Sequence, residues 1–238
     1  MPVISFANTK GGAGKTTAVL LLATELIRLG HRVTVLDADP QHWISRWAEM
    51  TGPTHNLQVI SEVTQCSLET HLRENDDVTD YFIIDLPGQR TPLLSLAIGV
   101  SDYIFIPVQG SAMDARGGAE VLEHIDFLSR RLGKFIPHSV ILTRVSPMIN
   151  TRSLLLVKGL MAQRDVDVLN TPIAERSAFR ELFDYGGTLE TLDPKKVSNL
   201  DKAKENARTY ARDILAKIPP RARYWPRNYP SSSGRSAA

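Results

Sequence analysis

Residues 9–17 read TKGGAGKTT, a glycine-rich stretch with two lysines. Gly14, Lys15 and Thr16 match the second half of the phosphate-binding loop pattern G-x-x-x-x-G-K-[ST], whereas Thr9 stands where that pattern has its first glycine. Lys10 is an additional cation inside the loop. Glycines let the backbone approach phosphate oxygens, and the N–H groups at the start of a helix attract anions. The stretch therefore predicts a nucleotide site whose loop has an altered front half.

Six short runs of β-branched and apolar residues alternate with longer helical patterns. Such near-continuous apolar strands are typical of a parallel sheet that helices cover on both faces. Residues 18–29 repeat apolar side chains at helical spacing, and Gly30 ends that pattern. The predicted fold class is α/β: a doubly wound, mainly parallel sheet flanked by helices, with ligands at the carboxyl ends of the strands. The expected strands are residues 3–7, 32–37, 57–60, 81–85, 103–108 and 139–143.

The chain length predicts one domain and a tail. With 238 residues, 42% of them hydrophobic, the chain can bury one substantial core, which we place in residues 1–218. A last helix is predicted after Leu200 because apolar residues recur there at helical spacing, namely Ala203, Ala207, Tyr210, Ile214 and Leu215. Pro219 and Pro220 end it. Residues 219–238 are rich in Pro, Ser and Arg, so a disordered basic tail is expected.

Composition also limits the cellular context. Cys66 is the only cysteine, so an internal disulfide is impossible and a reducing cytoplasm is expected. No apolar run approaches the ~20 residues that span a bilayer, so we expect a soluble protein. No helix-turn-helix pattern precedes the first strand, so recognition of a DNA operator is not expected.

The net charge of +2 hides an uneven distribution. Residues 195–238 carry eleven Lys and Arg against three Asp and Glu, which leaves a net negative charge on residues 1–194. A basic end on an acidic body favours a polyanionic partner, either nucleic acid or an anionic membrane. The alternative is a solvated, charged helix and tail.

Carboxylates at two further strand ends complete the predicted site. Lys15 would contact the β- and γ-phosphates of ATP, and Thr16 would bind Mg²⁺. Asp85 ends YFIID and is expected to hold Mg²⁺ through its water shell, with Asp37 supporting that shell. Asp39 is the candidate for orienting or deprotonating the attacking water. The loop residues expected to bind nucleotide are Gly11, Gly12, Ala13, Gly14, Lys15, Thr16 and Thr17.

The motifs KGGAGKTT, LDADPQ and IIDLPG resemble those of the ParA/MinD superfamily of ATPases with a deviant Walker A loop. The resemblance covers roughly residues 2–218 and is strongest to the small plasmid-partition ATPases of the ParF type. It implies that Lys10 is a signature lysine, which reaches the phosphates of the nucleotide on the other subunit of an ATP-sandwich dimer. A cation supplied in trans neutralises transition-state charge only after dimerisation, so it can couple hydrolysis to assembly.

The same resemblance implies an adenine pocket. The segment TPIAERSAFRELFDYGG is similar to the family region that walls this pocket and then forms a helix at the dimer edge. It implicates Pro172 and Ile173 in base contacts, with Thr143 and Arg144 as further candidates at a strand end. Glu175 and Arg176 depart from many partition ATPases and resemble the VirC-type ATPases of conjugal transfer.

The function that the resemblance implies is ATP-dependent plasmid or chromosome partition by a cytoplasmic, nucleoid-associated homodimer. The dimer would bind DNA without sequence preference and hydrolyse ATP to ADP and phosphate when a small centromere-binding or cargo adaptor protein stimulates it. Candidate DNA contacts are Arg176, Arg180, Lys195, Lys196, Lys202, Lys204, Arg208 and Arg212.

Three other functions are considered. A VirC-like conjugal-transfer or other cargo-positioning ATPase differs little in sequence from a partition ATPase. A MinD-like membrane ATPase is disfavoured because Pro226 and Pro230 oppose a basic amphipathic helix in the tail. A metabolic kinase is disfavoured because no dedicated acceptor pocket is identified.

Overall fold

A computed structural model describes residues 1–110, 112–146 and 165–218, together with Leu155, Val157, Gly159 and Met161; for residues 112–115 only the backbone is described. The predicted tail, residues 219–238, lies outside the described residues, and the extent of the domain stays a prediction. No helix in the described part of the chain is long and apolar enough to cross a membrane.

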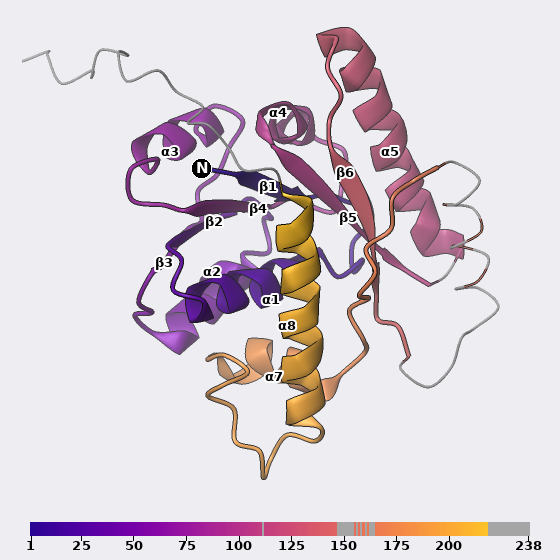
Figure 1. The fold of residues 1–238 in the computed structure, drawn as a ribbon. Coiled ribbons are helices and arrows are strands. Elements are labelled where there is room, and N and C mark those ends of the chain that lie inside the picture. Colours follow the sequence, from indigo (N-terminus) through magenta and orange to yellow (C-terminus); the bar gives the residue numbers. More distant parts are fainter. Residues whose placement is uncertain are drawn as a thin grey trace, which may run out of the picture.

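One six-stranded sheet forms the centre of the molecule (Figure 1). Its order is β3-β2-β4-β1-β5-β6, and every neighbouring pair is parallel. The predicted α/β fold class is confirmed, and each predicted strand is present with its ends shifted by at most one residue. The strands are β1 (Val3–Phe6), β2 (Val33–Asp37), β3 (Leu57–Ile60), β4 (Tyr81–Asp85), β5 (Tyr103–Gln109) and β6 (His138–Thr143).

Helices cover both faces of the sheet. One face packs against α1 (Lys15–Arg28), α2 (Trp43–Thr51), α7 (Ser177–Tyr185) and α8 (Leu200–Lys217). The other packs against α3 (Leu68–Glu74), α4 (Pro92–Val100) and α5 (Ala112–Leu132). Side chains of β1 alternate between these two cores, since Ile4 and Phe6 belong to the first and Val3 to the second. This is the doubly wound arrangement, in which ligands bind where the strands end.

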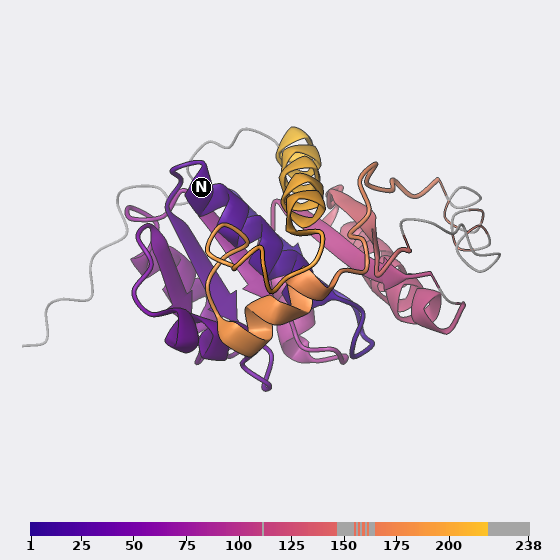
Figure 2. The same ribbon diagram turned by 90° about the horizontal axis from the view of Figure 1, so that it is seen from below.

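The last helix packs against the helix that follows the glycine-rich loop. Figures 1 and 2 show α8 lying against α1 on the same face of the sheet. Tyr210 of α8 is fully buried, and its hydroxyl donates a hydrogen bond to the Ala18 carbonyl oxygen over 3.1 Å. Ala203, Ala207 and Ile214 are buried in the same core, so the predicted apolar stripe is confirmed. Helix α8 therefore lies against α1 and helps to hold α1 in place.

Candidate nucleotide site

A cavity of about 460 Å³ opens at the carboxyl ends of the strands. This volume lies within the usual range for small-molecule sites. Four parts of the chain meet there: the loop between β1 and α1, the segment from the end of β2 to the start of α2, the end of β6, and the segment that includes α7. Its lining residues are Gly11, Gly12, Ala13, Gly14, Lys15, Thr16, Thr17, Asp39, Gln41, Trp43, Thr143, Arg144, Ile173, Ala174, Glu175, Arg176, Phe179, Arg180, Phe183 and Asp184.

Side chains of two strands hold the glycine-rich loop. Gln109 donates from Nε2 to the Gly12 carbonyl, and Thr143 donates from Oγ1 to the Ala13 carbonyl over 2.8 Å. Gly14 precedes α1 with a φ of 89°, and a Cβ there would lie 3.1 Å from the Cβ of Thr143. A residue with a side chain would be strained by this backbone and crowded by Thr143. The loop path is therefore set by residues about 100 positions away in sequence.

Lys15 places a buried cation at the base of the cavity. Its exposed fraction is 5%, and its Nζ donates to the Lys10 carbonyl oxygen at 3.4 Å. Burial lowers the pKa of Lys15, while the nearby carboxylates of Asp85 and Asp39 oppose that shift. The described hydrogen bond of this desolvated ammonium group is long. Phosphate oxygens bound beside it would therefore stabilise its charged form.

Two carboxylates lie side by side at neighbouring strand ends. Asp37 and Asp85 are paired in the register of β2 and β4, and both are fully buried. Oδ2 of Asp37 accepts hydrogen bonds from the backbone N and the hydroxyl of Ser45, at 2.9 and 2.7 Å. Oδ1 of Asp37 and both carboxylate oxygens of Asp85 have no hydrogen-bond partner among the described residues. Burial, followed by the Asp37 charge, raises the pKa of Asp85 to about 7, and the nearby Thr16 hydroxyl and Lys15 oppose this.

The acid pair fits a hard divalent cation. Buried carboxylate oxygens without donors are costly unless a cation or proton joins them. Mg²⁺ is usually held by one or two carboxylates together with phosphates and water, rather than by a complete protein cage. In the described part of the chain no group of three or more His, Cys, Asp or Glu side chains forms such a cage. Thr16, Asp37 and Asp85 are therefore suitable to hold Mg²⁺ only beside a bound nucleotide.

Substitution Asp85→Asn is expected to stabilise the nucleotide-free protein above neutral pH. Since the folded pKa of about 7 exceeds the ordinary 3.8, the folded state keeps a proton that the unfolded chain has lost. The free energy of unfolding then falls as pH rises from about 4 to 7. Asn cannot ionise, so the variant avoids this decrease. Its free energy of unfolding in urea should exceed that of wild type by roughly 2 to 4 kcal/mol at pH 8 and by little at pH 4. An equal gain at both pH values would contradict this, and the exposed Asp77→Asn is the control.

Of the other two predicted catalytic residues, Asp39 lies at the cavity and Lys10 does not. Asp39 lines the cavity, is partly exposed, and accepts a hydrogen bond at Oδ1 from the Gln41 backbone N over 3.0 Å. Lys10 is not among the described residues that line the cavity, although Lys15, five positions later, is. Its backbone N donates to Oδ1 of Asn8 over 2.8 Å. Only one of the two lysines therefore faces the cavity of its own chain.

The predicted adenine contacts are partly brought together. Ile173, Arg144 and Thr143 line the cavity, whereas Pro172 is not among the lining residues. The Pro172 carbonyl oxygen accepts a hydrogen bond from Asn206 of α8 over 2.9 Å, which ties this segment to the last helix. Base contacts by all four residues stay predictions.

Helix α7 forms a wall that the sequence reasoning did not assign to the site. Phe179 and Phe183 of this helix line the cavity together with Trp43 at the start of α2. The rings of Trp43 and Phe183 meet edge to face with centroids 6.5 Å apart. The available signal was the amphipathic pattern of residues 177–185, but that pattern cannot tell a cavity wall from a core face.

Two arginines predicted to bind DNA also line this cavity. Arg180 is ion-paired with Glu175, whose other oxygen lies 3.8 Å from Arg144. Nε of Arg176 is buried and has no hydrogen-bond partner in the described part of the chain. Their position favours contact with the nucleotide over contact with DNA, and the DNA role stays an untested prediction for both.

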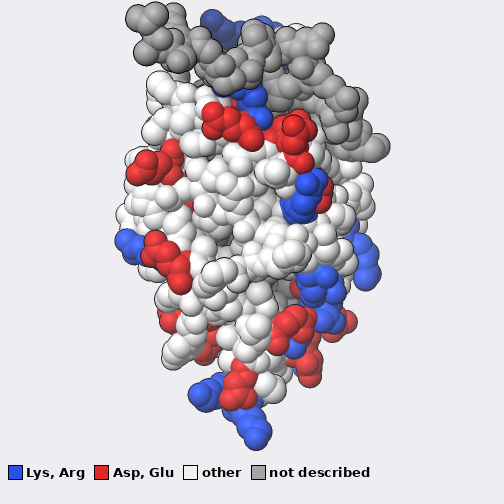
Figure 3. Space-filling model, turned by 90° about the vertical axis from the view of Figure 1, so that its left-hand side faces the viewer, with Lys and Arg blue, Asp and Glu red and all other residues white. Residues whose placement is uncertain are grey.

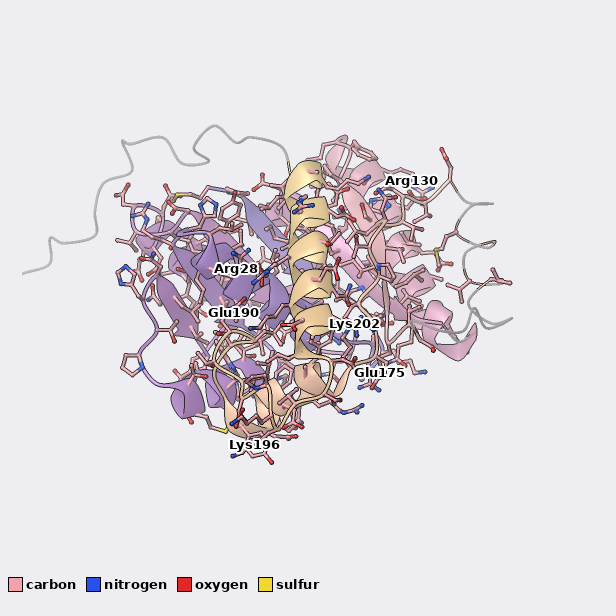
Figure 4. All side chains as sticks on the ribbon, turned by 60° about the horizontal axis from the view of Figure 1, so that its bottom comes forward. Arg28, Arg130, Glu175, Glu190, Lys196 and Lys202 are labelled. Atoms are coloured by element: carbon pink, nitrogen blue, oxygen red, sulfur yellow. The ribbon has the colours of Figure 1, made fainter. Side chains whose placement is uncertain are left out.

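The remaining predicted DNA contacts lie on and before α8. Lys204 and Arg208 are one helical turn apart and both pair with Glu190, at 2.9 and 2.6 Å. Lys202 is exposed on another side of α8, as Figure 4 shows by the opposite positions of Glu190 and Lys202 about the helix. Lys195, Lys196 and Arg212 are also exposed. These residues do not share one face.

Comparison with known proteins identifies the family. The family model described as VirC1 protein matches residues 1–215. Protein ParA of Rhizobium radiobacter is 34% identical over 218 residues, covering 92% of this chain and 98% of the relative. Protein virC1 of Rhizobium rhizogenes is 28% identical, covering 78% and 82%. Among solved structures, an ATP complex of McdA from Cyanothece has a TM-score of 0.71 at 19% identity, covering 94% and 99%. The chain therefore belongs to the VirC1 and ParA family of partition or positioning ATPases, within the ParA/MinD superfamily of P-loop ATPases.

Proposed function

We propose that this protein binds ATP with Mg²⁺ in the described cavity and hydrolyses it to ADP and phosphate. The observation that carries the proposal is the meeting of three features at one edge of the sheet. The glycine-rich loop and the buried Lys15 cation line the cavity, and the buried Asp37–Asp85 pair lies behind them, with Asp85 close to Lys15. Three carboxylate oxygens of that pair have no hydrogen-bond partner among the described residues. A cation facing the phosphates and a carboxylate pair for Mg²⁺ are the parts that phosphoryl transfer requires.

The main residues of the site have distinct roles in the proposed reaction. The loop N–H groups and Lys15 would bind the phosphates, and Thr16, Asp37 and Asp85 would hold Mg²⁺. The ion would supply positive charge that offsets the charge developing on the transferred phosphoryl group. Asp39 lines the cavity next to the loop and is partly exposed, so it can orient an attacking water. Ile173, Phe179 and Arg176 lie in the wall where the base and ribose would bind.

We propose that the reaction takes place in a dimer. The position of Lys10 supports this, because Lys10 is not among the described residues that line the cavity of its own chain. In the proposed sandwich, Lys10 contacts the nucleotide on the second subunit, so the catalytic charge set is complete only after ATP-dependent association.

The cellular role proposed is partition of plasmid or chromosomal DNA by a nucleoid-associated dimer that binds DNA without sequence preference. Support comes from the 34% identity to a protein named ParA over nearly its whole length. A small centromere-binding or cargo adaptor protein would stimulate hydrolysis and release the dimer. The VirC1 family match favours a second candidate, positioning of a conjugal-transfer complex by the same ATP cycle.

The Asp39→Ala variant tests the ATP cycle. If Asp39 orients the attacking water, its removal traps ATP between two subunits, and light scattering should show a dimer with ATP and Mg²⁺ but a monomer with ADP. ATP turnover should fall by about a hundredfold or more, as expected for the loss of a water-positioning group. The same mass with both nucleotides would exclude the sandwich.

DNA binding should depend on ATP and on exposed lysines that lie just before α8 and in its first turn. Joining two basic surfaces in a dimer increases the number of phosphates neutralised, and the salt dependence of affinity rises with that number. Changing Lys195, Lys196 and Lys202 together to Gln should weaken binding. The slope of log K against log salt should fall in magnitude by about 0.9 for each DNA phosphate that the variant no longer neutralises.

A matched control removes the same charge elsewhere. Arg130, Arg131 and Lys134 are exposed at the far end of α5, and Figure 4 places Arg130 well away from Lys196 and Lys202. Figure 3 shows that Lys, Arg, Asp and Glu of the described residues are interspersed on the face it presents, so that face offers no continuous basic surface. The assigned DNA-binding surface is wrong if changing Arg130, Arg131 and Lys134 to Gln lowers the salt dependence of DNA binding while changing Lys195, Lys196 and Lys202 does not. ATP-dependent binding to anionic vesicles without DNA binding would favour the MinD-like function.

A further inference from the structure

Thr9, which replaces the first glycine of the ordinary loop pattern, faces α5. Its Oγ1 donates to Oε2 of Glu120 over 2.8 Å and lies 3.3 Å from the Gly117 carbonyl oxygen. Thr9 is not among the described residues that line the cavity. A hydrogen bond to a carboxylate is charge-assisted and stronger than one between neutral groups. The altered front of the loop is therefore attached to a helix on the opposite face of the sheet from α1.

The backbone of α5 packs directly on the segment that carries Lys10. A Cβ on Gly117 would overlap Oδ1 of Asn8 and lie 2.9 Å from the Cβ of Lys10, so only glycine allows this approach. Asn8 is buried, and it donates from Nδ2 to the Pro107 carbonyl over 2.7 Å while its Oδ1 accepts from the Lys10 backbone N over 2.8 Å. Lys10 is thus held from β5 through Asn8 and from α5 through Gly117 and Thr9.

We propose that Glu120 is a positioning residue for Lys10, acting through Thr9. The inference rests on the proposed function, because Lys10 is useful there only if it projects toward the nucleotide of the second subunit. Oε1 of Glu120 lies 3.5 Å from Nε of Arg116, whose side chain is 85% exposed. The chain Arg116–Glu120–Thr9 therefore connects the solvent-exposed surface of α5 to the backbone of the signature lysine. In this proposal, the contact between Glu120 and Thr9 affects ATP hydrolysis. Nucleotide binding depends on the other half of the loop.

The kinetic test compares four single variants with the wild-type protein. Thr9→Val keeps the shape of the side chain but removes its hydroxyl, and Glu120→Ala removes the acceptor. Both should lower kcat about five- to twentyfold and leave the KM for ATP within about twofold, because the missing interaction acts only in the transition state. Thr9→Ser retains the hydroxyl and should keep kcat near that of wild type. Glu123→Ala removes an exposed carboxylate three positions further along the same helix and is the matched control.

The double variant Thr9→Val/Glu120→Ala identifies the pathway. If Glu120 acts through Thr9, the double variant loses no more activity than the stronger single variant, since coupled residues are not additive. Additive losses, equal losses in Thr9→Val and Thr9→Ser, or a raised KM with unchanged kcat would each overturn the proposal. All variants should show the wild-type melting temperature within a few degrees, and this confirms that they fold.

Amide hydrogen exchange of residues 8–12 in the nucleotide-free protein supplies a readout that needs no turnover. Exchange in this segment should become faster in Thr9→Val and Glu120→Ala, and stay as in wild type in Thr9→Ser and Glu123→Ala. If the wild-type protein hydrolyses no ATP, the proposed function fails, and exchange alone decides the positioning role. Equal exchange in all five proteins would then overturn it.

Discussion

Substitution Lys15→Ala is expected to weaken ATP binding by about a hundredfold or more, which corresponds to about 2.7 kcal/mol. Among the described residues, the buried ammonium group donates a hydrogen bond to the Lys10 carbonyl oxygen over 3.4 Å, and the phosphate oxygens of a bound nucleotide would be stronger acceptors. Charge-assisted hydrogen bonds in a site shielded from water account for a loss of this size. Titration calorimetry with ATP and Mg²⁺ measures it directly.

The control for Lys15 is an exposed lysine outside the cavity. Lys196→Ala removes the same charge from a surface segment before α8 and should leave the Kd for ATP unchanged within about twofold, since Lys196 is exposed to solvent, where salt screens its charge, and is not among the described residues that line the cavity. The fold should survive in Lys15→Ala, because burial already disfavours the charged form of Lys15. A Kd within threefold of wild type in a folded Lys15→Ala protein would exclude this cavity as the phosphate site.

Substitution Lys10→Ala is expected to leave the Kd for ATP within about threefold and to lower kcat by about a hundredfold or more. A cation supplied in trans to a transferring phosphoryl group contributes on the order of 10³ to 10⁵ in kcat in other phosphoryl-transfer enzymes. Lys10 does not line the cavity of its own chain, so its loss should not affect binding to the monomer. Single-turnover kinetics separate the two quantities.

A mixture of two inactive variants determines whether Lys10 acts in trans. A dimer of one Lys10→Ala subunit and one Asp39→Ala subunit has one complete site, which combines Asp39 of the first with Lys10 of the second. Random mixing before ATP is added should therefore restore about a quarter of wild-type turnover if the dimer completes the charge set. If Lys10 acts on its own subunit's nucleotide, no site in the mixture is complete and the mixture stays inactive.

Local patterns in the sequence were sufficient for the sheet and for the phosphate end of the site. Apolar runs in a parallel sheet are continuous, so the strands could be placed to within one residue. Because parallel strands end at one edge, residues that follow the strands must meet there, and the structure does bring Lys15, Asp37 and Asp85 together. No comparison with distant parts of the chain was needed for these conclusions.

Tertiary packing decided which charged residues face the cavity and which face solvent. Arg176 and Arg180 line the cavity because α7 and the residue before it form one of its walls, while Lys204 and Arg208 are paired with Glu190 from a preceding loop. The contact between Thr9 and Glu120 joins residues 111 positions apart in the sequence. Gly117 and Lys10, which also lie close together, are separated by a similar length of chain. Helical periodicity gives the face of a helix, but the partner of that face depends on how distant segments pack, which a local pattern does not encode.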